Sequence, residues 1–168
     1  MMGRIGHAGC RIGSVNQRFE ILEHPADVGF LAYGETLEEL FENAGLAMCS
    51  LGCAAERIEE QAEREIAASG ADVESLLYAW LAEILAVADA EQLVFRRVRV
   101  TKLRAPGEGE ADATRAVDAR GEVRGTAYGE RFDRERHAAG TYIKAVTLHQ
   151  FAVERVAEAW RARVFLDL

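Results

Sequence analysis

The chain has 168 residues, of which 49% are hydrophobic and 29% charged, and its formal net charge is −8 at pH 7. This length suits a single domain whose core needs no disulfide or metal to fold. The acidic balance argues against an extensive nucleic-acid surface, which requires clustered Lys and Arg. No apolar run reaches the roughly 18 residues of a membrane span, so we expect no association with a membrane.

The cysteines indicate a reducing compartment. The chain has three of them, so they cannot all form disulfides: Cys10, Cys49 and Cys53. A zinc site would need more ligands than Cys49 and Cys53 supply, and no other Cys or His pair has the spacing of a zinc finger. We therefore expect reduced thiols in a cytoplasmic protein.

The N-terminal part of the chain predicts a leader followed by two strands. Residues 1–17 are rich in glycine and lack a long apolar stretch, so they are expected to be a disordered leader rather than a signal peptide. Residues 18–168 are expected to form the folded domain. Phe19–Glu23 and Val28–Tyr33 predict strands, separated at Pro25, which has no backbone N–H to donate.

Two helices are indicated by capping residues and by apolar residues at helical spacing. Thr36 and Glu39 fit a capping box, and apolar positions continue from there to Met48. Asp72 is the expected cap of the second helix, in which Val73–Ala88 carries one continuous apolar stripe. Both stripes are typical of helix faces that pack on a sheet.

The other segments predict strands. Gln61–Ala68 is a weak candidate between the helices, whereas Leu93–Leu103 alternates clearly. Strand character follows in Thr114–Val123, Tyr142–Arg155 and Trp160–Leu168. The pattern favours an α+β fold, with two helices packed on a mostly antiparallel sheet in a single domain. The helices are too few for a doubly wound parallel sheet.

One basic cluster lies along the predicted strand Leu93–Leu103 and just beyond it. Its members are Arg96, Arg97, Arg99, Lys102 and Arg104. As a solvated strand edge the cluster needs no partner. As a contact for RNA or for an acidic protein it would add a binding surface, and the sequence leaves both interpretations open.

Carboxylates near both ends of the predicted domain are candidates for metal binding. His24 and Asp27 occur in a turn, where side chains can bind a ligand without entering the core, although Asp27 could instead bond its own backbone. Asp167 stands among apolar residues, where a carboxylate must be solvated or paired, and Leu168 adds a terminal carboxylate. If Asp27, Asp167 and Leu168 converge, these oxygen ligands suit only hard cations: Ca²⁺, Mg²⁺ or Mn²⁺. Spacing in the sequence cannot show that convergence.

Two further segments could line a site. In the first, the odd positions from Ile143 to His149 are expected to face the core, which leaves Lys144 facing solvent or a cleft. A single Lys on a strand is also commonly plain surface. In the second, Asp133 and His137 stand in a charged stretch that could line a site or simply be a solvated connection.

Several segments together resemble the archease family. The run His24-Pro25-Ala26-Asp27-Val28-Gly29 is similar to the family's H-x-A-D-I/V-G signature, except that Pro25 stands where Thr is common. Other matches follow in the family's order, in Glu35–Phe41, Leu76–Leu81, Gly129–His137, Ile143–Thr147 and Val164–Leu168. The resemblance runs from Phe19 to Leu168 and implies two helices on a mostly antiparallel sheet.

The resemblance also implies a function. Archeases are cytoplasmic, non-catalytic partners of the RtcB-type RNA ligase, which joins a 2′,3′-cyclic or 3′-phosphate RNA end to a 5′-hydroxyl through a guanylylated histidine. An archease promotes that guanylylation and multiple turnover in tRNA splicing or RNA repair, and contacts RNA only indirectly.

The resemblance assigns roles to particular residues. A divalent metal, expected to be Ca²⁺ with Mg²⁺ or Mn²⁺ as alternatives, would bind Asp27, Asp167 and the main chain of Leu168. Ligase activation is assigned to Lys144 together with the two aspartates. The candidates for lining the site are His24, Asp133, His137 and His149.

Two other functions compete with this one. A metal-dependent hydrolase would use Asp27 and Asp167 as ligands and His24 or His149 as a base. The sequence shows no nucleophile motif and no P-loop, which argues against that hydrolase. A general chaperone or bridging module would need no catalytic group.

Overall fold

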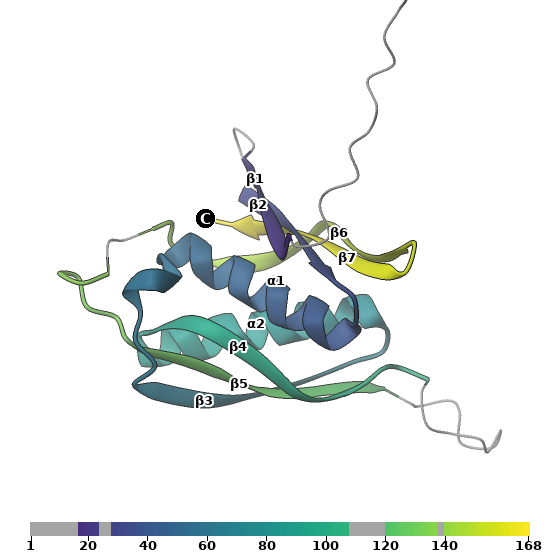
Figure 1. Cartoon of the computed structure of the whole chain (residues 1–168), viewed down its shortest axis with the longest axis horizontal. Helices are drawn as coiled ribbons and strands as arrows, with labels where there is room; N and C mark the ends of the chain where they lie inside the picture. The colour runs from purple at the N-terminus through teal and green to yellow at the C-terminus, as the bar shows by residue number, and fades with distance from the viewer. Residues whose placement is uncertain (1–16, 24–27, 108–119, 138–139) are drawn as a thin grey trace, which may run out of the picture.

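Two helices lie between two antiparallel sheets in the computed structural model (Figure 1), which describes residues 17–23, 28–107, 120–137 and 140–168. One sheet has the strand order β1-β2-β7-β6 and the other the order β3-β5-β4. In chain order the elements are β1 Phe19–Glu23, β2 Val28–Gly34, α1 Leu37–Gly52, the short 3₁₀ turn Ala55–Arg57, β3 Ala62–Gly70, α2 Val73–Glu91, β4 Leu93–Arg104, β5 Gly121–Arg131, β6 Ala145–Val156 and β7 Ala159–Asp167.

The α+β prediction is confirmed, and every strand pairing among the described residues is antiparallel. The difference from expectation is that the strands form two sheets, with the helices between them. Helix α1 contacts both β4 and β2, and α2 contacts both β3 and β6. Periodicity shows which face of a strand is buried, but it does not show which strands pair. The division into two sheets was therefore not visible in the sequence. The predicted boundary between residues 1–17 and the domain falls at the edge of the described residues and stays a prediction.

Both predicted helix caps form. The Thr36 hydroxyl accepts a hydrogen bond from the Glu39 N–H at 3.2 Å, while the Glu39 carboxylate accepts from the Glu35 N–H, one residue earlier than the capping box requires. At α2 the box is complete, because Asp72 and Ser75 each accept a bond from the other's backbone N–H. These caps satisfy N–H groups that lack partners inside the helices.

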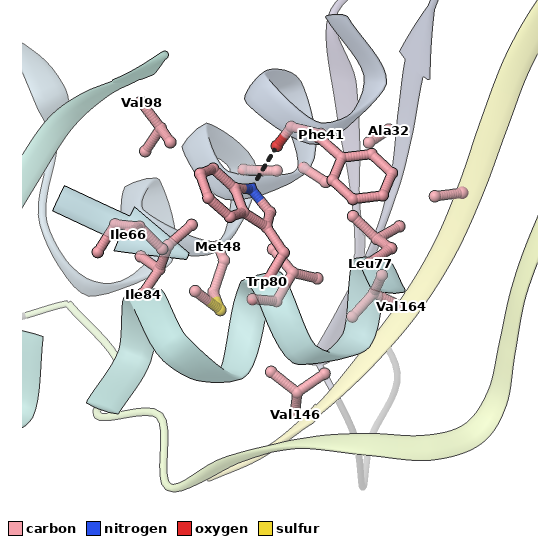
Figure 2. Packing of buried hydrophobic residues seen from close by; sticks show 14 of the residues in the cluster. Ala32, Phe41, Met48, Ile66, Leu77, Trp80, Ile84, Val98, Val146 and Val164 are labelled. Carbon is pink, nitrogen blue, oxygen red and sulfur yellow. Dashed lines mark hydrogen bonds between the residues drawn. The ribbon is translucent and has the colours of Figure 1, made fainter. Parts of the chain in front are cut away.

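Trp80 fixes the two helices against each other at the centre of the core. Its side chain is 0% exposed, and its indole N–H donates to the Phe41 carbonyl at 3.2 Å (Figure 2). Figure 2 shows Val98 of one sheet near this ring, Val146 of the other sheet on the far side of α2, and Val164 of that second sheet near Leu77. Side chains from both sheets therefore pack on the helical layer and form one continuous core.

Strand β5 is the main error in the predicted elements. It runs from Gly121 to Arg131, whereas the prediction placed strand character in residues 114–123, of which 114–119 lie outside the described residues. Glycine lowers the β-propensity of this segment, but two of its glycines are needed for close packing. A Cβ at Gly125 would collide with the Arg99 carbonyl and the Trp80 ring, and one at Gly129 would collide with the Val94 carbonyl. The glycine-rich segment that the prediction left out is therefore a tightly packed strand.

The basic cluster is largely paired within the chain. Arg97, Arg99 and Arg104 form salt bridges with Glu60, Glu42 and Glu122. The Arg96 guanidinium donates to the Ile58 carbonyl. Exposed pairs of this kind contribute at most about 1 kcal/mol each, but they neutralise much of the positive charge, which favours the interpretation as a solvated strand edge. Among the described residues, no helix combines the length and apolarity needed to cross a membrane.

Candidate functional site

Three strand ends meet at one end of the four-stranded sheet. Strand β7 lies between β2 and β6, and its last residues pair with the first residues of both neighbours. Leu166 is opposite Val28 on one side and Val146 on the other, and Asp167 is opposite Ala145. This sheet end, defined by the start of β2, the start of β6 and the last residues of β7, brings together three of the segments that resemble the archease family.

Asp167 is exposed at the sheet end. Alternation along β7 buries Ala162, Val164 and Leu166 against the helices, so that Asp167 belongs to the opposite face. Its carboxylate is exposed to solvent, as expected for a charged group that must be solvated or paired. Leu168 follows it and is also exposed. Carboxylate and main-chain oxygens in such a position suit Ca²⁺ or another hard cation.

Lys144 fastens the end of the chain to the segment before β6. Its backbone N–H donates to the Asp167 carbonyl at 2.8 Å, and its ammonium group donates to the main-chain oxygen of Leu168 at 2.5 Å. The Lys144 side chain is exposed, as expected. Nothing in the sequence indicated this contact, because it joins two segments that approach each other only through the pairing of β6 with β7.

The predicted alternation around Lys144 is wrong after Ile143. Strand β6 begins at Ala145, and Val146 is buried while Ala145 and His149 are exposed. The register between β6 and β7 also shifts between Thr147 and Ala152, where extra residues bulge out of the ladder. Ile143 precedes the strand, so its burial does not set the alternation of β6, and the bulge interrupts that alternation again around His149.

His149 lies in this bulge on the exposed side of β6. Its ring contacts the Phe165 ring edge-on, with 6.0 Å between the centroids, and its Nε2 lies 3.1 Å from the Gln150 amide nitrogen. Since Phe165 is two residues from Asp167 along β7, His149 lies toward the sheet end. The structure shows no bond between His149 and Asp167.

His24 and Asp27, two of the predicted site residues, lie outside the described residues. Their neighbour Val28 pairs with Leu166, so the described part of β2 begins beside the strand end that carries Asp167. Within the described ranges no three His, Cys, Asp or Glu side chains gather in a manner that could hold a metal. The predicted ligand set therefore depends on Asp27 and stays a prediction.

Asp133 and His137 belong to a separate polar network after β5. His137 is fully buried; its Nδ1 accepts from the Asp133 N–H at 2.9 Å and its Nε2 lies 3.1 Å from the Glu130 carboxylate. Because Nδ1 accepts, Nε2 carries the proton and donates to Glu130. Arg136 adds two bonds to the same carboxylate, at 2.7 and 3.0 Å.

Glu130 is the centre of that network, and the sequence analysis did not single it out. Its carboxylate also accepts from the Glu59 N–H at 2.7 Å, and this bond, followed by those from Arg136 and His137, lowers the pKa of Glu130 to about 2. These bonds of Glu130, Arg136 and His137 all run to other members of the same network. The network therefore holds the turn after β5 in place. The sequence signal was a Glu and a His seven residues apart in a segment that resembles the family.

The fold and the sheet end define the class: a single-domain α+β protein in which two helices separate two antiparallel sheets. Residues 19–168 match the model of the Archease protein family (MTH1598/TM1083), and the chain belongs to that family. It is similar to the protein archease of Methanosarcina mazei, with 39% identity over 155 residues that cover 92% of this chain and 99% of that protein. The protein archease of Pyrococcus furiosus is 37% identical over 153 residues, which cover 90% and 99% of the two chains.

Solved structures agree with this assignment. The solution structure of protein 1598 of Methanobacterium thermoautotrophicum has a TM-score of 0.71 and 35% sequence identity, covering 90% of this chain and 99% of that one. A crystal structure from Thermotoga maritima, named as an archease and possible chaperone, has a TM-score of 0.54 at 18% identity and covers 88% and 94%. At that identity the second likeness supports the fold alone.

Proposed function

We propose that this protein activates an RtcB-type RNA ligase in the cytoplasm, by promoting guanylylation of the ligase and its multiple turnover in tRNA splicing or RNA repair. The protein itself catalyses no reaction and contacts RNA only indirectly. The observation that carries the proposal is the contact of Lys144 with the main chain of Asp167 and Leu168. It joins two segments that resemble the archease family at one exposed end of the sheet.

The sheet end is also proposed to bind a divalent metal, Ca²⁺ first, with Mg²⁺ or Mn²⁺ as alternatives. The carboxylates of Asp27 and Asp167 and the main-chain oxygen of Leu168 would hold it. Two observations support this: Asp167 is exposed with no salt-bridge partner among the described residues, and oxygen is the ligand atom that these cations prefer. The bound cation would supply positive charge that attracts phosphate groups.

Charge supports a protein partner with a cationic site. The chain carries a net charge of −8, so its surface is acidic overall. A ligase that binds GTP and metal needs cationic groups around its nucleotide, and complementary charge speeds the association of two proteins. The sheet end would approach that nucleotide site, with the Lys144 ammonium group oriented by its bond to Leu168.

The first test is a guanylylation assay with the cognate ligase, GTP and metal. The protein at substoichiometric concentration is expected to raise the rate of ligase guanylylation, and on its own it is expected neither to join RNA nor to hydrolyse GTP. An unchanged ligase rate contradicts the proposal. Turnover of a substrate without the ligase would instead indicate a metal-dependent hydrolase, and the absence of both activities would indicate a general chaperone or bridging module.

Replacing Lys144 with alanine is expected to reduce ligase activation while leaving the fold intact. The side chain is exposed and its bond to Leu168 is a surface contact, so the free energy of unfolding should change by within about 0.5 kcal/mol. Guanylylation rates and thermal melting measure the two effects. The matched control is Lys102→Ala, an exposed lysine in β4 of the other sheet, which should change neither. A large drop in melting temperature for Lys144→Ala would show a structural role instead.

A further inference from the structure

A pocket of about 320 Å³ opens between the C-terminal ends of α1 and α2, the start of β4 and the segment that precedes β6. Its walls are mainly apolar and include Met48, Leu85, Phe95, Phe132, Tyr142 and Ile143. Burial also raises the pKa of the Cys49 thiol in this wall to about 12, so that the thiol stays uncharged near neutral pH. Asp89, at the mouth, is the one charged residue among those that line the pocket, so the interior suits an apolar group.

The mouth of the pocket combines exposed aromatic surface with a carboxylate that has no salt bridge within the described ranges. Tyr142 is 65% exposed and Phe132 is 39% exposed, both unusually high for large apolar side chains. The Tyr142 hydroxyl donates to the Asp89 carboxylate at 3.3 Å. Asp89 forms no salt bridge with any cation in the described ranges, unlike Glu91, which pairs with Arg64. A positively charged group could bind there without displacing an existing ion pair.

The pocket is continuous with the proposed activation site. Tyr142 and Ile143 line it, and the next residue is Lys144, which binds the end of β7. This segment is held to α1, because the Gly140 and Thr141 N–H groups donate to the carbonyls of Gly52 and Leu51 at 3.0 and 2.9 Å. In Figure 1 the C-terminal ends of both helices and of β7 lie on the same side of the molecule. A protein that touches Lys144 therefore also meets the pocket mouth.

We propose that this pocket receives a bulky apolar side chain of the partner ligase, from a segment that also places a cationic side chain against Asp89. The inference rests on the proposed function and names the docking contact that accompanies it. The volume accommodates a large side chain, and large side chains that enter well-packed pockets dominate the affinity of protein interfaces. The Asp89 carboxylate, which has no salt bridge within the described ranges, and the net charge of −8 favour a cationic segment over the phosphates of a nucleic acid or an anionic membrane.

The test uses two substitutions at the pocket and one distant control. Tyr142→Ala removes an exposed wall, and Ala88→Phe fills the space from α2. Val156→Ala alters another exposed apolar residue, 45% exposed at the far end of β6. Binding of each full-length variant to the cognate ligase is measured by calorimetry, together with guanylylation rate and the melting temperature with and without Ca²⁺. Because Ala88 is half-buried, its variant is interpreted only if it melts like the wild type, and the exposed Tyr142 provides the variant that folds in any case.

Tyr142→Ala, and Ala88→Phe if it folds, should raise the Kd for the ligase about tenfold or more. The shift in melting temperature that Ca²⁺ induces should stay unchanged in both variants. Val156→Ala should match the wild type in every measurement. Pocket variants that bind as tightly as the wild type, in a protein that still activates the ligase, would overturn the inference alone. A wild-type protein that neither binds nor activates the ligase would overturn the proposed function and the inference with it. Loss of self-association in Tyr142→Ala, with ligase binding unchanged, would assign the pocket to a second copy of this chain and overturn the inference.

Discussion

Replacing Asp167 with alanine should abolish the stabilisation of the protein by divalent metal and the activation of the ligase, without unfolding the domain. Asp167 is exposed, and its contact with the Lys144 N–H uses the main-chain carbonyl, which alanine retains. A ligand that binds only the folded state at a hundredfold excess over its Kd stabilises by about 2.7 kcal/mol. The wild-type melting temperature should therefore rise with Ca²⁺, Mg²⁺ or Mn²⁺, and that of Asp167→Ala should not.

Asp27→Ala should behave in the same way if both aspartates hold one cation. Glu158→Ala is the matched control, because this exposed carboxylate lies between β6 and β7 at the far end of the same strand pair, and its variant should keep the full metal response. An equal response in Asp167→Ala and in the wild type would remove Asp167 from the site. A wild-type protein whose melting temperature responds to none of the three metals would remove the site itself.

The Glu130→Ala variant should show a large loss of stability. Its carboxylate is buried and accepts bonds from Glu59, Arg136 and His137, so truncation leaves the buried His137 Nε2–H without its partner. Removing one member of a buried charged network typically costs about 3 kcal/mol or more. For a chain of this length, that corresponds to a fall in melting temperature of roughly 10 °C.

The control is Glu122→Ala, which removes an exposed glutamate from the same strand. Its partner Arg104 lies 3.7 Å away at the surface, so the free energy of unfolding should change by less than about 1 kcal/mol. Urea unfolding monitored by circular dichroism measures both variants. Equal and small losses in the two would show that the Glu130 network contributes little to the fold.

The contribution of Glu130 should also depend on pH. Its pKa in the folded protein is about 2, below the ordinary value of 4.5, because the bonds from Glu59, Arg136 and His137 favour the charged form. A lowered pKa stabilises the folded state fully above the ordinary value, and this stability is lost as pH falls from about 4.5 toward 2. The difference between wild type and Glu130→Ala should therefore be largest at neutral pH and should shrink in acid. A difference that is constant across this range would contradict the pKa assignment.

Local signals in the sequence predicted most of the elements, since they depend on neighbouring residues. Thr36 and Asp72 were identified as caps because a short polar side chain before an apolar stripe typically accepts a hydrogen bond from a backbone N–H of the first helical turn. Strand β5 was misplaced because Gly125 is required by the approach of Trp80, a residue far away in the sequence. The division into two sheets has the same origin: β2 pairs with β7, near the other end of the chain.

The candidate site was predictable only in part. Exposure of Lys144 was predicted from an alternation that β6 does not follow, and its bonds to Asp167 and Leu168 depend on the pairing of β6 with β7. Resemblance to a family marked Asp133 and His137 without showing that they serve a buried carboxylate. The pocket beside Tyr142 left no pattern in the sequence, because its walls come from four separate segments.

Strand β7 follows all other described strands in the sequence, and it lies in the middle of its sheet, between β2 and β6. On the ribosome, β3, α2, β4 and β5 emerge before β7, and their three strands can pair with one another without it. Strand β2 must wait for β7, a partner that is synthesised much later, and until then its open edge is exposed to pairing with other chains. A nascent chain that lacks β7 therefore cannot present Lys144 fastened to Leu168, and the surface proposed to meet the ligase appears only after β7 has been synthesised.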